Sequence, residues 1–167
     1  MELRIRTATE DDLPAITEIY NQAVALQSAT ADISPVSMES RRAWLNEHSP
    51  DQYPVLIAEN GDDIPGWCSL SAYRPGRMAL RHTAEISYYI DERFRGKGVG
   101  SVLIANAIAQ CDKLGIKTLF AIVLDVNRDS ALILEKFGFA QWGHLPGVAD
   151  FGGRECGHLY YGLRVIP

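Results

Sequence analysis

The residues of this chain that could do chemistry lie close together: one glutamate in an apolar run, and a glycine-rich turn behind it. Glu85 stands within residues 84–90, and the turn from Arg95 to Gly100 has glycine at every second position from 96. Burial among apolar neighbours would raise the pKa of a carboxyl toward that of a useful general base. A glycine-rich turn that starts a helix presents several free backbone N–H groups, and phosphates bind there. The stretch therefore predicts proton transfer beside a phosphate-binding turn.

Two elements must position these groups. Residues 84–90 are rich in β-branched and aromatic side chains, which predicts a largely buried strand. Residues 101–114 contain no proline or glycine and are apolar on most faces, which predicts a core helix. The turn between them then lies at the positive end of the helix dipole.

Two familiar phosphate loops do not fit this turn. A Walker loop needs Ser or Thr after Gly-Lys, but Gly98 follows Lys97. A dinucleotide fingerprint needs a third glycine or alanine, where this chain has Ser101 or Leu103. The alternative is that the glycines only make a tight connection between strand and helix. The turn does resemble the Arg-x-x-Gly-x-Gly pyrophosphate loop of the GNAT superfamily of N-acetyltransferases, which bind acetyl-CoA, at Arg95, Gly98 and Gly100.

Length and composition indicate one domain, residues 1–167, with a small-molecule partner. The chain is 47% hydrophobic and 22% charged, which is ordinary for a protein with a sizeable core. A net charge of −5 without a basic run argues against nucleic acid and membrane as partners. The chain has no signal-peptide pattern and no long apolar run, so it is expected to be soluble and cytoplasmic.

Cysteines and histidines indicate neither a disulfide framework nor a metal site. Cys68, Cys111 and Cys156 are far apart and are expected to be buried thiols in a reducing compartment. The four histidines show no metal-ligand spacing, so no metal is expected.

Hydrophobic periodicity indicates a mixed α/β (α+β) fold with the element order β-α-α-β-β-β-α-β-α-β-β. The clearest local signals are a first helix that Thr9 caps, with Asp12 completing an approximate capping box, and a hairpin turn at 60–63. That first helix is expected to end near Leu26. The remaining strands are expected at 3–8, 54–59, 64–72, 117–124, 141–145 and 159–165, and the remaining helices at 38–48 and 127–137.

Three segments are expected to be loops. Residues 27–36 are small and polar, and a long loop inside a compact domain is often a binding loop. Residues 73–83 concentrate arginine in an acidic protein. Such a run is usually solvated, but its junction with the strand of Glu85 favours anion recognition. Residues 146–157 are glycine-rich and are expected to separate the last two strands.

The similarity to one branch of the GNAT superfamily extends over nearly the whole chain. Residues 83–100 resemble the phosphinothricin and methionine sulfoximine acetyltransferases, as do Ile19-Tyr20-Asn21, Asn127-x-x-Ser130 and Glu135-Lys136-x-Gly138-Phe139. The resemblance implies the GNAT fold, a twisted mixed sheet of about seven strands flanked by about four helices. It also implies a homodimeric cytoplasmic enzyme that moves acetyl from its cosubstrate acetyl-CoA directly to the primary α-amino group of a small amino-acid-like substrate.

The resemblance assigns cofactor contacts to matching positions. Backbone groups of Tyr88, Tyr89 and Ile90 are expected to pair with the pantetheine arm, because the strand splays from its neighbour there. Asn127, Ser130 and Lys136 are also assigned to the cofactor, although Asn127 could instead only cap the helix that follows it. The pyrophosphate is expected to bind the turn residues Arg95, Gly96, Lys97, Gly98, Val99, Gly100 and Ser101.

The resemblance also makes Glu85 the base that takes a proton from the substrate ammonium, directly or through water. Tyr73, Arg74 and Arg81 are predicted to join Glu85 in binding the substrate. The two arginines are chosen because a guanidinium group holds a carboxylate with two parallel hydrogen bonds. The alternative for Glu85 is a structural ion pair with Arg74, Arg81 or His82.

Two departures from the family pattern bear on the chemistry. Many members carry His or Tyr where this chain has Leu134, so a general acid at that position is not carried over. Residues 156–158, Cys-Gly-His, stand where relatives often have an aromatic residue and an aspartate, which bears on the choice of substrate. The candidate substitutes for the acid, which the sequence does not rank, are Tyr73, Tyr88, His144, His158 and Tyr160.

Two other functions stay open at this point. One is an acetyltransferase for another primary amine, such as a polyamine, an aminoglycoside or a protein N-terminus. Polycationic amines call for an acidic pocket, whereas residues 74–82 are basic. The other is a non-catalytic module that binds acetyl-CoA as a sensor, which Leu134 keeps open.

Overall fold

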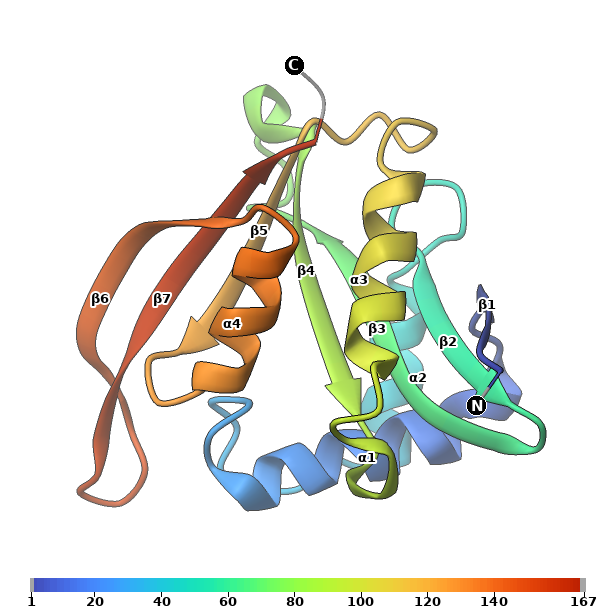
Figure 1. Ribbon diagram of the computed structural model, residues 1–167, viewed down its shortest axis with the longest axis horizontal. Helices are drawn as coiled ribbons and strands as arrows, with labels where there is room; N and C mark the ends of the chain where they lie inside the picture. Colours follow the sequence, from blue (N-terminus) through green and yellow to red (C-terminus); the bar gives the residue numbers. More distant parts are fainter. Residues whose placement is uncertain (1, 166–167) are drawn as a thin grey trace.

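A computed structural model describes residues 2–165, which form one seven-stranded sheet in the order β1-β2-β3-β4-β5-β7-β6 (Figure 1). The ends of the expected domain, residues 1 and 166–167, lie outside the described residues. In chain order the elements are β1 (Arg4–Thr7), α1 (Leu13–Leu26), α2 (Met38–Asn46), β2 (Val55–Asn60), β3 (Asp63–Ala72), β4 (Thr83–Ile90), α3 (Val99–Gln110), β5 (Thr118–Leu124), α4 (Arg128–Lys136), β6 (Ala140–Asp150) and β7 (Glu155–Arg164).

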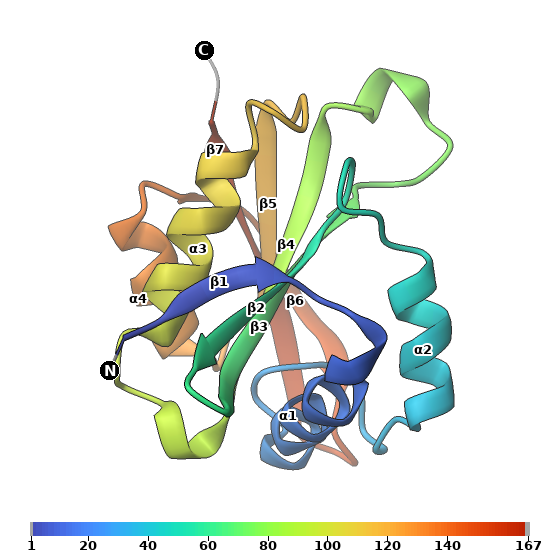
Figure 2. The same cartoon turned by 90° about the vertical axis from the view of Figure 1, so that its right-hand side faces the viewer.

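Helices cover both faces of the sheet, with α3 and α4 on one face and α1 and α2 on the other (Figure 2). Side chains of β4 alternate between these layers. Ala84 and Ile86 are buried in one core cluster with residues of α3, while Tyr89 packs against Trp67 in the cluster that includes α1. Glu85 shares the face of Tyr89, because strand residues four positions apart point the same way.

The mixed α/β class and the order of helices and strands agree with the sequence prediction. β2 and β3 form the expected hairpin, with Asn60 opposite Asp63. The capping box is also present, and the Thr9 N–H donates to the Asp12 carboxylate at 2.7 Å. Thr9 caps a short 3₁₀ turn, Glu10–Asp12, which leads into α1, and the N-cap of α1 itself is Asp12. The helices expected to reach residues 48 and 114 end earlier, at 46 and 110, and α3 begins two residues before the expected start.

The expected loop at 146–157 is wrong, because most of it belongs to a long hairpin. β6 continues to Asp150 and β7 begins at Glu155. Proline and glycine were interpreted as loop residues, but an edge strand tolerates both where its register is irregular. The β6 register shifts between Leu145 and Ala149. Gly157 lies inside β7. A residue with a side chain would not fit there, because an added Cβ would meet the Asp125 carboxylate at 2.5 Å.

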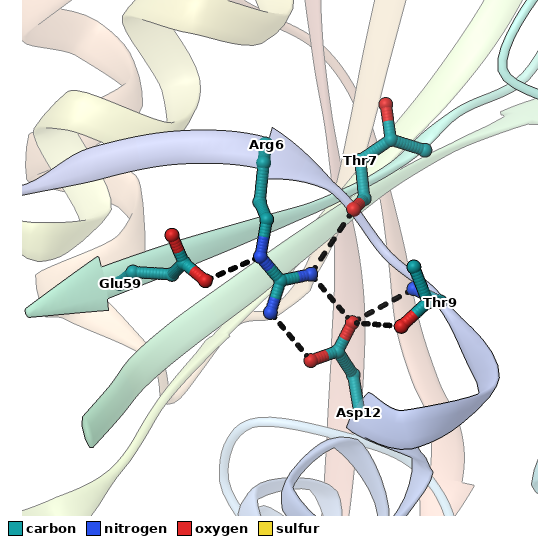
Figure 3. Close-up of polar contacts among 5 residues, drawn as sticks. All are labelled: Arg6, Thr7, Thr9, Asp12 and Glu59. Carbon is teal, nitrogen blue, oxygen red and sulfur yellow. Dashed lines mark hydrogen bonds and ion pairs between the residues drawn. The ribbon is translucent and has the colours of Figure 1, made fainter. Parts of the chain in front are cut away.

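Arg6 ties the edge strand β1 to β2 and to the start of α1 (Figure 3). Its guanidinium donates to both carboxylate oxygens of Asp12 at 2.7 Å and pairs with Glu59. Burial alone would raise the pKa of Asp12, but hydrogen bonds from Arg6 and Thr9 outweigh it, and the pKa is lowered. The contact therefore stabilises the fold above the ordinary pKa of an aspartate.

Candidate active site

β4 and β5 lie side by side only over their first residues and then separate. Residues 83–85 pair in parallel with residues 118–120. No further register pair joins these two strands in the described chain, and Figure 1 shows them diverging toward the lower part of the view. On its other side β4 stays paired with β3 as far as Ile90. Glu85 is therefore the last residue paired with β5 before the strands open.

The pairing with β3 decides which β4 amides face this opening. Just past the strand, the Asp91 N–H donates to the Pro65 carbonyl at 2.9 Å. Hydrogen-bonded and non-hydrogen-bonded pairs alternate along an antiparallel ladder, and this one has no register shift. The N–H and C=O groups of Tyr88 and Ile90 therefore turn toward the opening. The N–H and C=O groups of Tyr89 face β3 instead, because Tyr89 lies between these two residues in the alternation. This differs from the expectation that the Tyr89 backbone would also be free.

The glycine turn ends at the first turn of α3. Gly98 caps the helix at a φ of 85°, a conformation that other residues adopt with strain. The Val102 N–H donates to the Gly98 carbonyl at 3.2 Å, so the N–H groups of residues 99–101 have no acceptor within the helix. The first turn carries no acidic side chain. These amides lie at the positive end of the helix, an arrangement that suits an anion.

A cavity of about 890 Å³ lies where the opening meets this turn. That volume is in the range of small-molecule sites. Residues of α1, such as Ala23, complete the wall and were not expected. Ser28 also lines it and belongs to the 27–36 loop, which was interpreted as a possible binding loop. Lys97 does not line the cavity, and its ammonium lies 5.2 Å from the ring centre of Phe94. The other residues assigned to the cofactor all line it: Tyr88, Tyr89, Ile90, Arg95, Gly96, Gly98, Val99, Gly100, Ser101, Asn127, Ser130 and Lys136.

One side chain in this wall lacks a partner. Tyr88 Oη is buried and has no hydrogen-bond partner among residues 2–165. Burial raises the pKa of Tyr88 to about 12, so the hydroxyl stays neutral and can donate a hydrogen bond. The cavity also contains the cationic side chains of Arg95 and Lys136. Acetyl-CoA fits these groups, because it carries phosphates at one end and hydrogen-bonding amides along its arm.

Glu85 is half-buried, and burial raises the pKa of its carboxyl. Among residues 2–165 the carboxylate makes no ion pair with Arg74, Arg81 or His82. Arg81 instead donates to the Met78 carbonyl at 3.0 Å, and His82 Nδ1 lies 2.7 Å from the Gly115 carbonyl. The structure therefore does not support the alternative of a structural ion pair.

Comparison with known proteins agrees with this geometry. Residues 2–140 match the family model described as an acetyltransferase (GNAT) domain. The chain belongs to the GNAT acetyltransferase family. YwnH of Bacillus subtilis, which carries a provisional name as a phosphinothricin acetyltransferase, is 38% identical over 165 residues, covering 98% of this chain and 97% of YwnH.

Two further relatives define the branch of the GNAT family. The L-methionine sulfoximine/L-methionine sulfone acetyltransferase of Pseudomonas aeruginosa is 32% identical over 168 residues, covering 100% of this chain and 97% of that protein. A phosphinothricin acetyltransferase of Sinorhizobium meliloti, solved in complex with acetyl-CoA, matches with a TM-score of 0.92 and 27% identity, covering 98% of this chain and 89% of that one. This GNAT protein is thus an acetyltransferase of the phosphinothricin and methionine sulfoximine branch.

Leu134 and Asn127 of this GNAT enzyme both have structural roles. Leu134 is fully buried in the core and supplies no acid. Of the five candidate substitutes, Tyr88 is the one that lines the large cavity. Asn127 Oδ1 accepts a hydrogen bond from the Ser130 N–H at 3.2 Å and so caps α4. Asn127 also lines the large cavity, so the same residue caps the helix and forms part of the cavity wall.

The residues predicted for the substrate lie at the other end of β4. Tyr73, Arg74 and Arg81 line a second cavity, of about 400 Å³. Glu85 lines neither cavity. Tyr73 connects the two groups, because its ring centre is 4.9 Å from that of Phe120, the β5 residue in register with Glu85. The structure thus places Tyr73 near the catalytic strand pair and leaves the two arginines exposed at its edge.

Two polar residues beside Glu85 were missed by sequence reasoning. Ser71 lies directly opposite Glu85 on β3. His48, just past α2, places Nε2 3.1 Å from Ser71 Oγ. No local pattern connects position 48 with position 85, because only the packing of α2 on the sheet and the β3–β4 register bring them together. Their signal is therefore absent from the sequence taken alone.

The three cysteines are buried and free, as expected. Burial raises the pKa of Cys68 to about 12 and that of Cys111 to about 11, so both thiols are weak nucleophiles. Within residues 2–165, His, Cys, Asp and Glu side chains form no group of three or more that could hold a metal ion. In the same part of the chain no helix has the length and apolar character needed to cross a membrane.

Proposed function

We propose that this enzyme moves acetyl from acetyl-CoA directly to the primary α-amino group of a small amino-acid-like substrate of the phosphinothricin, methionine sulfoximine or methionine sulfone type. One observation carries the proposal: Glu85, half-buried and without an ion-pair partner in residues 2–165, stands where β4 and β5 separate. The names of relatives that match almost the whole chain support this class of substrate.

The wall of the large cavity supports a defined way of holding acetyl-CoA, which would supply the acetyl group as a thioester. The amides of residues 99–101, with Arg95 and Lys136, would hold the pyrophosphate. The backbone groups of Tyr88 and the N–H of Ile90 would bind the pantetheine arm like an added strand, whatever their side chains. The Ile90 carbonyl already accepts a hydrogen bond from Arg95 Nε at 3.4 Å. The closed end of the opening, at Glu85, would then be the reacting end.

The main chemical task left to the chain is removal of a proton. An α-ammonium group is not a nucleophile, so a base must take its proton before the nitrogen can attack. Burial raises the pKa of Glu85 above that of an exposed glutamate and makes its carboxylate a stronger base. The N–H bond breaks as the carboxylate gains the proton, and the neutral amine is released for attack.

The substrate carboxylate is assigned to Arg74 and Arg81. Both line the basic cavity at the start of β4, and a guanidinium group can hold a carboxylate with two hydrogen bonds. Arg74 adopts a φ of 56°, which is uncommon for a residue with a side chain. The rings of Tyr73 and Phe120, between this cavity and Glu85, offer an apolar wall for the substrate side chain.

A panel of amines tests the proposed function. The purified protein is mixed with acetyl-CoA and with phosphinothricin, methionine sulfoximine, methionine sulfone, a decarboxylated sulfone analogue, spermidine, kanamycin or a short peptide, and release of free CoA is followed. The amino acids are expected to react fastest and the decarboxylated analogue more slowly. A polyamine, aminoglycoside or peptide as the best substrate would contradict the proposed class. Binding of acetyl-CoA without turnover on any amine would contradict transfer itself.

We further propose that residues 1–167 act as one domain within a cytoplasmic homodimer. Trp142, Leu145 and Val148 are exposed along the edge strand β6, which supports a surface for self-association. Three buried free thiols are consistent with a reducing compartment. Light scattering during gel filtration is expected to give twice the chain mass of 18.5 kDa. A single chain mass at micromolar concentration would contradict the dimer.

A further inference from the structure

Ser71 and His48 form a hydrogen-bonded pair beside Glu85 that the proposed acetyl transfer does not use. Ser71 and Glu85 are directly opposite in the β3–β4 ladder. Side chains of opposite residues leave a sheet on the same face, with Cβ atoms about 4.5–5.5 Å apart. Ser71 Oγ lies 3.1 Å from Nε2 of the half-buried His48. The three side chains thus form a row that leads away from the base.

The second nitrogen of His48 decides the direction of these hydrogen bonds. Nδ1 lies 2.8 Å from the backbone carbonyl of Trp44, which can only accept. In the neutral imidazole Nδ1 therefore carries the hydrogen, and Nε2 is the acceptor. The Ser71 hydroxyl must then donate to Nε2, which leaves lone pairs of its oxygen for a donor on the Glu85 side. The Trp44 ring, with its centre 4.5 Å from that of the imidazole, helps to hold this orientation.

Other groups on this side of Glu85 offer no comparable path. The next aromatic side chain on the same face of β4 is Tyr89, four residues along the strand, and its ring packs against those of Tyr20 and Trp67. Arg74 and Arg81 are permanently charged donors and cannot accept a proton. His82 is turned toward the Gly115 carbonyl.

We propose that Ser71 and His48 are the relay through which the proton taken up by Glu85 leaves the site. The relay rests on the proposed function, because it requires Glu85 to be the base. Neither residue is assigned a contact with substrate, so both act through Glu85. A single bridging water can complete the contact between Glu85 and Ser71.

The relay moves one proton and returns each group to its starting form. The protonated Glu85 carboxyl gives its proton to Ser71 Oγ while the original Ser71 O–H bond breaks and its proton passes to His48 Nε2. The N–H bond at Nε2 of the resulting imidazolium then breaks, and water or a buffer base that reaches the half-buried ring takes this proton while Nδ1 keeps its own. The Ser71 hydroxyl turns back toward Nε2. Glu85 is a carboxylate again, Ser71 has one hydrogen, and His48 is neutral, so the next ammonium group can be deprotonated.

The test compares Ser71→Ala, His48→Gln and His48→Ala with the parent, with imidazole as the added base. Each variant is expected to lose about tenfold in kcat, less than the ~10²–10⁴-fold expected for loss of the base itself, with KM for both substrates unchanged. His48→Ala leaves space at the end of the relay, so rising imidazole concentration is expected to restore its kcat. The parent rate is expected to be insensitive to imidazole.

Two variants serve as controls for a structural effect. Ser71→Thr keeps a hydroxyl and is expected to keep the parent rate. Ser69→Ala removes a hydroxyl from the same face of β3, opposite Ser87 rather than Glu85, and is also expected to keep it. The Tm and the Kd for acetyl-CoA are measured for every variant, so that a folding defect is recognised.

Two results would overturn the relay. One is a parental kcat in both Ser71→Ala and His48→Gln. The other is a loss of rate that imidazole does not restore in His48→Ala and that Ser71→Thr shares, because it marks a structural role. Glu85→Gln keeps the two proposals apart. Full activity in Glu85→Gln would refute the base itself, whereas a strong defect there beside active Ser71 and His48 variants would refute the relay alone.

Discussion

The two flanks of β4 differ in how far they are paired with their neighbours. Toward β3, the ladder continues without a register shift from Ala84 opposite Ala72 to Ile90 opposite Gly66. Toward β5, pairing ends at Glu85. One strand therefore forms a continuous structural ladder on one side and lines a cavity on the other.

Packing at each flank shows why only one of them can hold a ligand. At the β3 flank, a Cβ added to Gly66 would lie 2.8 Å from the Tyr89 carbonyl oxygen, so nothing fits between the strands. At the β5 flank, backbone groups of Tyr88 and Ile90 face a cavity and have no strand partner within residues 2–165, and the Ile90 carbonyl accepts only from Arg95 Nε at 3.4 Å. Because backbone polar groups need a partner, a ligand with amides of its own is the natural occupant.

The largest effect is expected at the point where the open flank begins. Glu85→Gln removes proton transfer and keeps the shape of the side chain, so kcat is expected to fall ~10²–10⁴-fold while the Kd for acetyl-CoA stays the same. Initial rates and calorimetry measure the two quantities. The defect is expected to shrink as pH rises, because more of the amine arrives deprotonated. An undiminished rate at neutral pH would assign Glu85 to structure.

A smaller effect is expected at the edge of the paired end, where the substrate carboxylate is assigned. Arg81→Met is expected to raise KM for methionine sulfone about 10- to 150-fold. This factor corresponds to a loss of ~1.5–3 kcal/mol of binding free energy, the range for a lost hydrogen bond to a charged group. Arg77→Met is the control, because Arg77 lines the same cavity without being assigned to substrate. The KM for the decarboxylated analogue is expected to be nearly the same in Arg81→Met as in the parent, because this analogue has no carboxylate for Arg81 to bind. An equal rise in KM in the Arg77 variant would contradict a specific contact between Arg81 and the substrate carboxylate. It would mean that only the positive charge of the cavity matters.

Tyr88→Phe sharpens the comparison through the side chain that the open flank leaves without a partner. Loss of one hydrogen bond is expected to weaken acetyl-CoA binding by ~0.5–1.5 kcal/mol, about 2- to 10-fold in Kd. The Tm of the ligand-free protein is expected to stay the same or rise, since the hydroxyl has no partner among residues 2–165. A lower Tm with unchanged Kd would mean that the hydroxyl serves the fold.

The smallest expected effect is on the free energy of unfolding. Its change with pH is expected to have opposite signs for Glu85 and Asp12. Burial raises the pKa of Glu85, so the folded protein binds this proton more tightly than the unfolded chain. Its contribution to stability is greatest below the ordinary glutamate pKa of about 4.3 and is lost as pH rises through the folded pKa. The free energy of unfolding of Glu85→Gln, relative to the parent, is therefore expected to increase from pH 4 to pH 8.

Asp12 provides the opposite case and the control. Its pKa is lowered in the fold, so its contribution is present above the ordinary aspartate pKa and is lost as pH falls through the folded value. Asp12→Asn is therefore expected to become less stable than the parent as pH rises from acid to neutral. Urea unfolding at a series of pH values measures both differences. The same slope in both variants would contradict the assigned pKa directions.

Local signals in the sequence predicted the elements, and long-range pairing lay beyond them. Apolar periodicity, the Thr9 cap and the turn at 60–63 act within a few residues, and the structure has each of them. The turn at Gly98 was predicted for the same reason, because its φ of 85° is a local demand on the backbone. The hairpin within 146–157 was missed, since its strands contain residues that more often mark loops.

The site was predictable only where it is local. The residues from 88 to 101 that were assigned to the cofactor are close in sequence, and nearly all of them line one cavity. The Tyr89 amide faces β3 because of the register between β3 and β4, and the sequence of β4 alone does not predict that register. The same holds for Ser71, which reaches Glu85 through that register, and for His48, which reaches Ser71 through the packing of α2.

Residue-resolved amide hydrogen exchange tests the central claim most directly. Within residues 2–165, Tyr88 and Ile90 have no strand partner on the open flank, whereas the register turns the Tyr89 amide toward β3. The amides of Tyr88 and Ile90 are therefore expected to exchange fast in the free protein and to slow markedly in saturating acetyl-CoA. Tyr89 should be slow in both states. Unchanged exchange at Tyr88 and Ile90 in the bound protein would contradict the claim that the separation of β4 from β5 is the binding site.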